Sequence, residues 1–131
     1  MLIIDGVLTT ITENDLVDGV FHNDQITGVG GFCFYNMPNL IKVDLPNVVK
    51  LGLSCFYRNE KLTMINVPAL LSCGTNCFSN NPSLVTINAP LIQNIKASVF
   101  HNRSLSNLNV CGQELSVEDV DGFCFVIEST R

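Results

Sequence analysis

Hydrophobic positions recur along this chain at a period of about 22 residues. A phenylalanine, a leucine and a proline each return at almost constant spacing. The phenylalanine column is Phe34, Phe56, Phe78 and Phe100, the leucine column is Leu40, Leu62, Leu84 and Leu105, and the proline column is Pro46, Pro68 and Pro90. Such repetition predicts stacked structural units that bury their apolar positions against one another.

Within each unit, one segment alternates between apolar and polar residues, which is the pattern of a half-buried strand. These segments are residues 40–45, 62–67, 84–89 and 105–110. A unit with one strand and no room for a long helix falls in the range of about 20–29 residues that is typical of leucine-rich repeats. We therefore expect an α/β-type solenoid, a short right-handed leucine-rich-repeat coil with one parallel β-sheet, mostly strand and loop with little helix.

Glycine and cysteine also occupy fixed positions in the repeat. Gly30, Gly52 and Gly74 stand shortly before each phenylalanine, where we expect a tight bend. Of the six cysteines, four directly precede a phenylalanine; they are Cys33, Cys55, Cys77 and Cys124. Because Val99 holds the same position in another repeat, this column calls for a small apolar side chain, and we expect reduced structural thiols. No zinc pattern is complete, and no metal or cofactor is expected.

The segment Ile26–Leu40, together with residues 84–102, resembles the repeat of BspA-like (Treponema pallidum-type) leucine-rich-repeat proteins. The resemblance covers about residues 26–110. It implies a repeat fold and a binding function, since members of that family are often surface or secreted proteins that bind host or partner proteins.

The chain divides into three parts. Residues 26–110 hold the leucine-rich repeats, residues 1–25 are an N-terminal cap with a degenerate coil, and residues 111–131 are an irregular C-terminal repeat and cap. The sequence Val20-Phe21-His22-Asn23 echoes residues 99–102, so we expect Phe21 to be equivalent to the repeated phenylalanines.

Charge is unevenly distributed, although the net charge is only −5. The segment 1–24 contains acids but no Lys or Arg; these acids are Asp5, Glu13, Asp15, Asp18 and Asp24. One interpretation is a polar cap that prevents end-to-end stacking of solenoids. The other is a docking surface, with a secondary acidic site at Glu114, Glu118, Asp119 and Asp121.

The outward positions of the expected strands are the best candidates for binding a partner. They are Ile41, Lys42, Asp44, Thr63, Met64, Asn66, Val85, Thr86, Asn88, Asn107 and Asn109. One column reads Asp-Asn-Asn-Asn, which favours either a binding surface or a ladder of amides bonded between coils. Exposed apolar and amide groups together are typical of a protein-binding surface.

We expect a protein-interaction module that is not an enzyme. His22 and His101 occupy a repeat position, and no nucleophile converges on them. The alternatives are a small acidic inhibitor or effector of a host or competitor enzyme, and a BspA-like surface adhesin.

The partner is expected to be another protein, with neither nucleic acid nor membrane involved. The chain is expected to be a monomer or homodimer. Cysteine usage favours a reducing, cytoplasmic compartment. The alternative is a secreted or cell-surface protein, if a signal peptide was removed.

Overall fold

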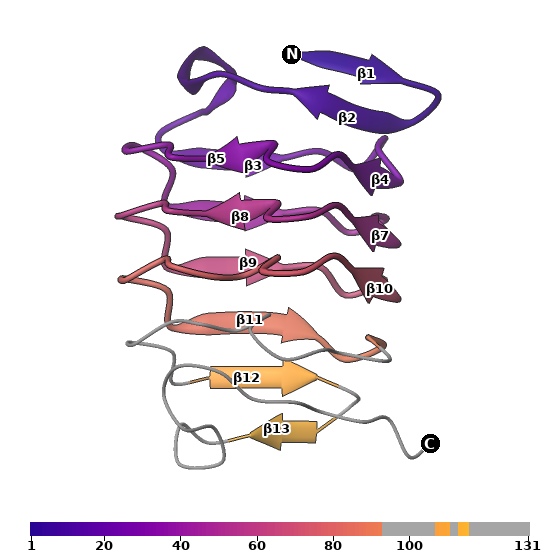
Figure 1. Cartoon of the computed structure of the whole chain (residues 1–131), viewed down its shortest axis with the longest axis vertical. Coiled ribbons are helices and arrows are strands. Elements are labelled where there is room, and N and C mark those ends of the chain that lie inside the picture. Colours follow the sequence, from indigo (N-terminus) through magenta and orange to yellow (C-terminus); the bar gives the residue numbers. More distant parts are fainter. Residues whose placement is uncertain (93–106, 111–112, 116–131) are drawn as a thin grey trace.

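The protein is a solenoid whose coils stack one on another along the long axis of the molecule (Figure 1). The computed structural model describes residues 1–92, 107–110 and 113–115. The expected solenoid of parallel strands with little helix is confirmed. In the described part of the chain, the one helical segment is the short η1 (Glu13–Asp15).

Among the described residues, the largest sheet has six strands in the order β13-β12-β11-β9-β6-β3. Its strands are β3 (Val20–His22), β6 (Lys42–Asp44), β9 (Met64–Asn66), β11 (Thr86–Ala89), β12 (Asn107–Val110) and β13 (Gln113–Leu115). All pair in parallel except β12 with β13. The first three repeat strands begin two residues later than the alternation predicted, because residues before them form a turn in which the N–H of Leu40 bonds the carbonyl of Met37.

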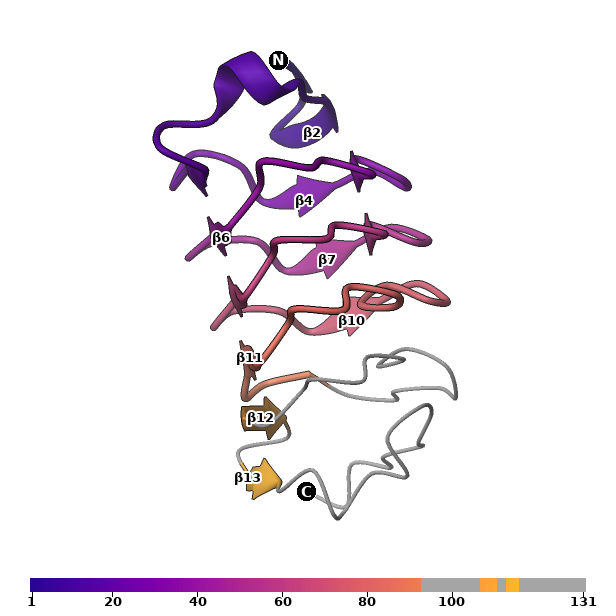
Figure 2. The same cartoon turned by 90° about the vertical axis from the view of Figure 1, so that its left-hand side faces the viewer.

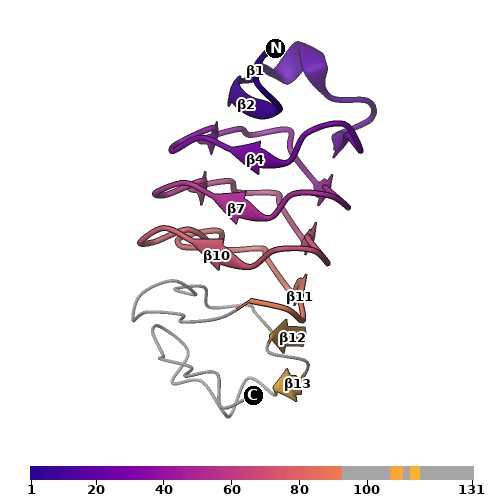
Figure 3. The same cartoon turned by 90° about the vertical axis from the view of Figure 1, so that its right-hand side faces the viewer.

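The coils also contribute to two further sheets that the sequence pattern did not predict. One has the order β1-β2-β4-β7-β10, with β1 (Leu2–Ile4), β2 (Val7–Thr10), β4 (Gly28–Val29), β7 (Lys50–Leu51) and β10 (Ser72–Cys73). The other pairs β5 (Phe34–Tyr35) with β8 (Phe56–Tyr57). Figures 2 and 3 place β5 and β8 on the opposite side of the coils from β6 and β9, so the two coils that hold β5 and β8 have three strand-bearing sides.

The N-terminal cap differs from the prediction in its register. Phe21 pairs with Val43 in the large sheet, so it occupies the strand position of the coil and not the position of the repeated phenylalanines. Its ring packs edge-on against Phe34, with 5.4 Å between centroids. The expected equivalence of Phe21 with the repeated phenylalanines is therefore wrong, and Phe21 instead covers the first of them.

The core consists of columns of apolar side chains stacked from coil to coil, and the phenylalanine and leucine columns are made of identical residues. The ring centroids of Phe34 and Phe56 lie 4.8 Å apart, and those of Phe56 and Phe78 lie 5.9 Å apart, with nearly parallel rings. These rings are buried, as are the repeated leucines Leu40, Leu62 and Leu84. A single coil cannot bury its own apolar column, so each coil depends on its neighbours for stability.

A buried asparagine ladder closes the turns between β5 or β8 and the next strand of the large sheet. Oδ1 of Asn59 accepts from the N–H of Met37 at 2.9 Å, and Nδ2 of Asn59 donates to the carbonyl of Phe34 at 2.7 Å. Asn81 makes the equivalent bonds to the N–H of Asn59 and the carbonyl of Phe56. The amides satisfy backbone groups that would otherwise be buried without partners.

Two of the repeated glycines, Gly52 and Gly74, are needed for close approach of coils, and none of the three is needed for a bend with positive φ. A Cβ on Gly52 would collide with the backbone nitrogen of Gly31 and lie 2.7 Å from the carbonyl carbon of Gly30. The left-handed backbone falls elsewhere in the turn, at Phe32, Ser54 and Asn76, and again at Asn36, Arg58 and Asn80.

Candidate partner-binding face

The outer side of the large sheet brings most of the predicted binding residues together. We call this surface the strand face, and its described side chains are Lys42, Asp44, Met64, Asn66, Thr86 and Asn88. Parallel register aligns Lys42, Met64 and Thr86 in one column and Asp44, Asn66 and Asn88 in the next. The backbone of Asn107 and Asn109 continues the two columns in β12. The six side chains are half-buried, so each one is partly accessible to a partner.

The second column is a hydrogen-bonded ladder. Nδ2 of Asn88 donates to Oδ1 of Asn66, and Nδ2 of Asn66 donates to Oδ1 of Asp44, both at 2.8 Å. Nδ1 of His22 lies 2.7 Å from the other oxygen of Asp44. Among the described residues, the ladder therefore runs over four strands, and the carboxylate of Asp44 receives bonds from both sides.

Asp44 is electrostatically the most perturbed residue of the strand face. Partial burial raises the pKa of its carboxyl, but the hydrogen bonds from Asn66 and His22 outweigh that effect, so the pKa lies below its ordinary value. Bonds that favour the ionised form have this effect because protonation would remove an acceptor. The carboxylate is thus ionised at neutral pH, with its oxygens directed along the ladder.

His22 is a member of this ladder, and the sequence analysis did not include it among the candidate binding residues. It had been grouped with His101 because each histidine follows a phenylalanine. The better signal was its spacing, since His22 stands one full repeat before Asp44 and pairs with it in the sheet. His101 lies outside the described residues.

Three of the predicted binding residues lie just before the strands instead of on them. Ile41, Thr63 and Val85 form a column in the preceding turn, held together by N–H bonds of 2.8 Å from Thr63 to Ile41 and 3.0 Å from Val85 to Thr63. Ile41 is 43% exposed. This column borders the strand face and adds apolar surface to it.

The acidic ends are only partly described. Glu114 lies in β13, where it pairs in register with Asn109, whereas Glu118, Asp119 and Asp121 lie outside the described residues. At the other end, the carboxylate of Asp15 accepts the N–H of Thr12 at 2.9 Å and lies 3.4 Å from the amino group of Met1. The bond from Thr12 is the largest cause of the lowered pKa of Asp15. This acid therefore stabilises the cap.

The four thiols in the described part of the chain show no sign of chemical activation. Cys33, Cys55, Cys73 and Cys77 are not joined by disulfides. Burial raises the pKa of Cys33 to about 12, and it also raises that of Cys77. The pKa of Cys73 is raised by its hydrogen bond with Cys77 and by burial. Since the thiolate is the nucleophile and the metal ligand, the raised pKa values disfavour both roles at Cys33, Cys73 and Cys77.

Among the described residues, no cluster of three or more His, Cys, Asp or Glu side chains is placed to hold a metal ion. His22 and Asp44 form a close pair, and the next members of the ladder, Asn66 and Asn88, carry amides, which are neither nucleophiles nor acids. The arrangement can hold hydrogen bonds at fixed positions, which suits recognition.

The repeated coils with their parallel strands, phenylalanine column and asparagine ladder define a leucine-rich-repeat protein. The BspA type leucine rich repeat region matches residues 13–128 in six copies, and the chain belongs to this family. Proteins of this family are generally non-enzymatic, and leucine-rich-repeat modules commonly mediate protein–protein interaction. No curated protein and no solved structure matches the chain.

Over the described residues, no helix has both the length and the apolar character needed to cross a bilayer.

Proposed function

We propose that this protein is a non-enzymatic interaction module that binds a partner protein through the strand face and the turns beside it. The observation that carries the proposal is the pairing of a fixed polar column with an apolar border on one side of the solenoid. The polar column runs from His22 to Asn88, and the border includes Ile41 and Val85. Such mixed surfaces are typical of protein-binding sites.

The ladder supports binding because it presents donors and acceptors in set positions. A side-chain amide has two N–H groups. One N–H of Asn66 donates to Asp44 within the ladder, which leaves the second N–H for a partner. The strands beneath are tied to both neighbouring coils, so little conformational entropy is lost when a partner docks. Met64 lies beside Asn66 in the adjacent column and supplies flexible apolar contact.

The inert thiols support a reducing compartment, and the protein acts there as a monomer or homodimer. The family resemblance supports a second setting, in which the same face serves as a surface adhesin that binds a host protein. Both settings use the strand face in the same way, so one set of variants tests the binding surface for either.

The test is affinity capture from lysate of the source cell, or of a host cell, with immobilised protein. The double variant Met64→Glu/Asn88→Arg places two charges on the strand face without altering buried positions. We expect wild-type protein to retain a partner. The amount of partner retained by this variant should be at least about tenfold lower, because buried unpaired charges disfavour an interface.

The matched control is Leu71→Glu/Ser72→Arg. It introduces one negative and one positive charge at exposed positions at and beside β10, away from the strand face. Both variants should melt close to wild type. The proposal fails if the strand-face variant retains the partner as well as the control does.

A further inference from the structure

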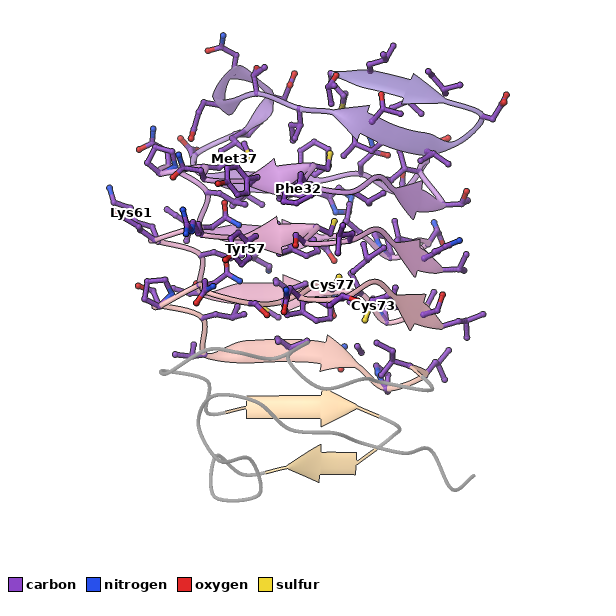
Figure 4. The ribbon with its side chains drawn as sticks, viewed as in Figure 1. Phe32, Met37, Tyr57, Lys61, Cys73 and Cys77 are labelled. Carbon is purple, nitrogen blue, oxygen red and sulfur yellow. The ribbon has the colours of Figure 1, made fainter. Side chains whose placement is uncertain are left out.

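A ridge of exposed aromatic side chains runs along the side of the solenoid opposite the strand face. Phe32 and Tyr35 meet edge to face at 5.7 Å, and Tyr35 stacks on Tyr57 at 5.8 Å. Phe32 is 51% exposed and Tyr35 is 40% exposed. We call Phe32, Tyr35, Leu53, Tyr57 and Arg58 the aromatic ridge; Figure 4 shows Phe32 and Tyr57 on the near side of the molecule.

The aromatic ridge is a departure from the repeat. In the third coil the positions equivalent to Phe32, Leu53 and Tyr57 are occupied by Asn76, Thr75 and Ser79. The β-strand register confirms the alignment of Tyr35 with Tyr57. The third coil keeps the left-handed residues of the turn and the buried phenylalanine with small polar residues at these places. The stacking of coils therefore does not require the aromatic side chains.

The backbone adds a second reason to regard Phe32 as selected for contact. Its φ is +56°, equal to that of Asn76 in the third coil, so the turn demands a left-handed residue. Asn or Gly adopts this conformation easily, whereas a bulky side chain is strained there. An exposed phenylalanine in a position that favours asparagine gains nothing for the fold, and such strain is characteristic of binding sites.

Positive charge flanks the aromatic ridge. The guanidinium of Arg58 lies over the ring of Tyr57, with its Cζ 5.4 Å from the centroid. Lys61 follows in the next turn and is exposed (Figure 4). In the described structure neither side chain forms an ion pair, so their donors are available to an anionic group. The one acid in the segment 45–92 is Glu60, against three bases, Lys50, Arg58 and Lys61.

We propose that the aromatic ridge is a second binding surface, and that it takes an extended acidic segment of a partner protein in which carboxylates flank a leucine or aromatic side chain. The apolar side chain packs against Phe32 and Leu53, which is 49% exposed beside it. The carboxylates pair with Arg58, whose planar fork and stacked position suit carboxylate recognition. This surface is independent of the strand face.

The repeat itself supplies the variant for a test. In Phe32→Asn/Tyr57→Ser/Arg58→Asn, each new residue is the one that the third coil carries at the equivalent position, namely Asn76, Ser79 and Asn80. Two of the three changes place asparagine at a positive φ, so the variant should be at least as stable as wild type. Phage-displayed random dodecapeptides are selected in parallel on wild type and on this variant.

The proposal predicts that wild type alone enriches peptides combining Asp or Glu with Leu or an aromatic residue. A synthetic copy of the most enriched peptide should bind the ridge variant at least about tenfold more weakly and the strand-face variant Met64→Glu/Asn88→Arg unchanged. Its affinity for wild type should fall as salt is raised from about 50 to about 300 mM, as expected for charge pairing.

Three results would overturn the proposal. In the first, the two selections enrich the same peptides or none. In the second, the enriched peptides lack carboxylates. In the third, sedimentation shows that wild type self-associates and the ridge variant does not, which would make the ridge an interface between copies of this chain.

Discussion

Asparagine occupies two columns of the solenoid, and its surroundings decide its role in each. Asn59 and Asn81 are fully buried and bond backbone groups of the neighbouring coil. Asn66 and Asn88 are half-exposed and bond side chains. Because burial without a partner is costly, the first column is structural, whereas the second can exchange its bonds with water or a partner.

The two columns give a stability prediction. Asn59→Ala leaves the N–H of Met37 and the carbonyl of Phe34 buried without their partner, so it should lower the free energy of unfolding by about 3 kcal/mol. Asn66→Ala should cost below about 1 kcal/mol, because water can replace its bonds. Urea denaturation of the two variants and wild type measures both values. Equal losses would show that the buried ladder is not essential.

Asp44 gives a prediction for acid stability. Its pKa is lower in the folded protein than in the unfolded chain, so its contribution is present above the ordinary carboxyl pKa of about 4 and is lost as pH falls through the folded value. Asp44→Asn keeps an acceptor for Asn66 but cannot titrate. Its unfolding free energy should therefore fall less steeply than that of wild type below about pH 4. Parallel pH profiles for the two proteins would contradict the role assigned to the carboxylate.

Among the elements, the repeat period was enough to predict the coils, the large sheet and the stacked phenylalanines. It was insufficient for β4, β7 and β10, because two-residue strands show no alternation of apolar and polar side chains. The register of Phe21 was also missed. Matching Phe-His-Asn by composition favoured the wrong column, whereas Phe21 stands one full repeat before Val43, and this spacing is what the sheet follows.

The glycine column provides a prediction at the same scale. Gly52→Ala forces a Cβ into the backbone of Gly30 and Gly31, which cannot move aside as a side chain can. We expect a loss of about 3 kcal/mol or more, as for other overpacked sites. Gly28→Ala is the control, because its nearest neighbour would be a methyl group of Val7 at 3.4 Å. If thermal denaturation shows that Gly28→Ala is less stable than Gly52→Ala, close approach of the coils is not the reason for the glycine at position 52.

The chain as a whole presents two surfaces on opposite sides of a narrow solenoid (Figures 2 and 3). The strand face could be proposed from the sequence, because alternation within a strand assigns each residue to one side. The aromatic ridge could not, because it lies in turns and two-residue strands where alternation gives no direction. The departure of Phe32 and Tyr57 from the third coil was visible, but only the structure brings the two rings together with Tyr35.

The most direct test of the central claim, that the strand face binds the partner, is site-specific photo-cross-linking. A benzophenone amino acid replaces Met64 on the strand face in one sample and Leu71 beside β10 in another; both side chains reach the surface. Irradiation in lysate should yield a cross-linked partner from position 64 and little or none from position 71. A partner cross-linked from position 71 and absent from position 64 would contradict the account.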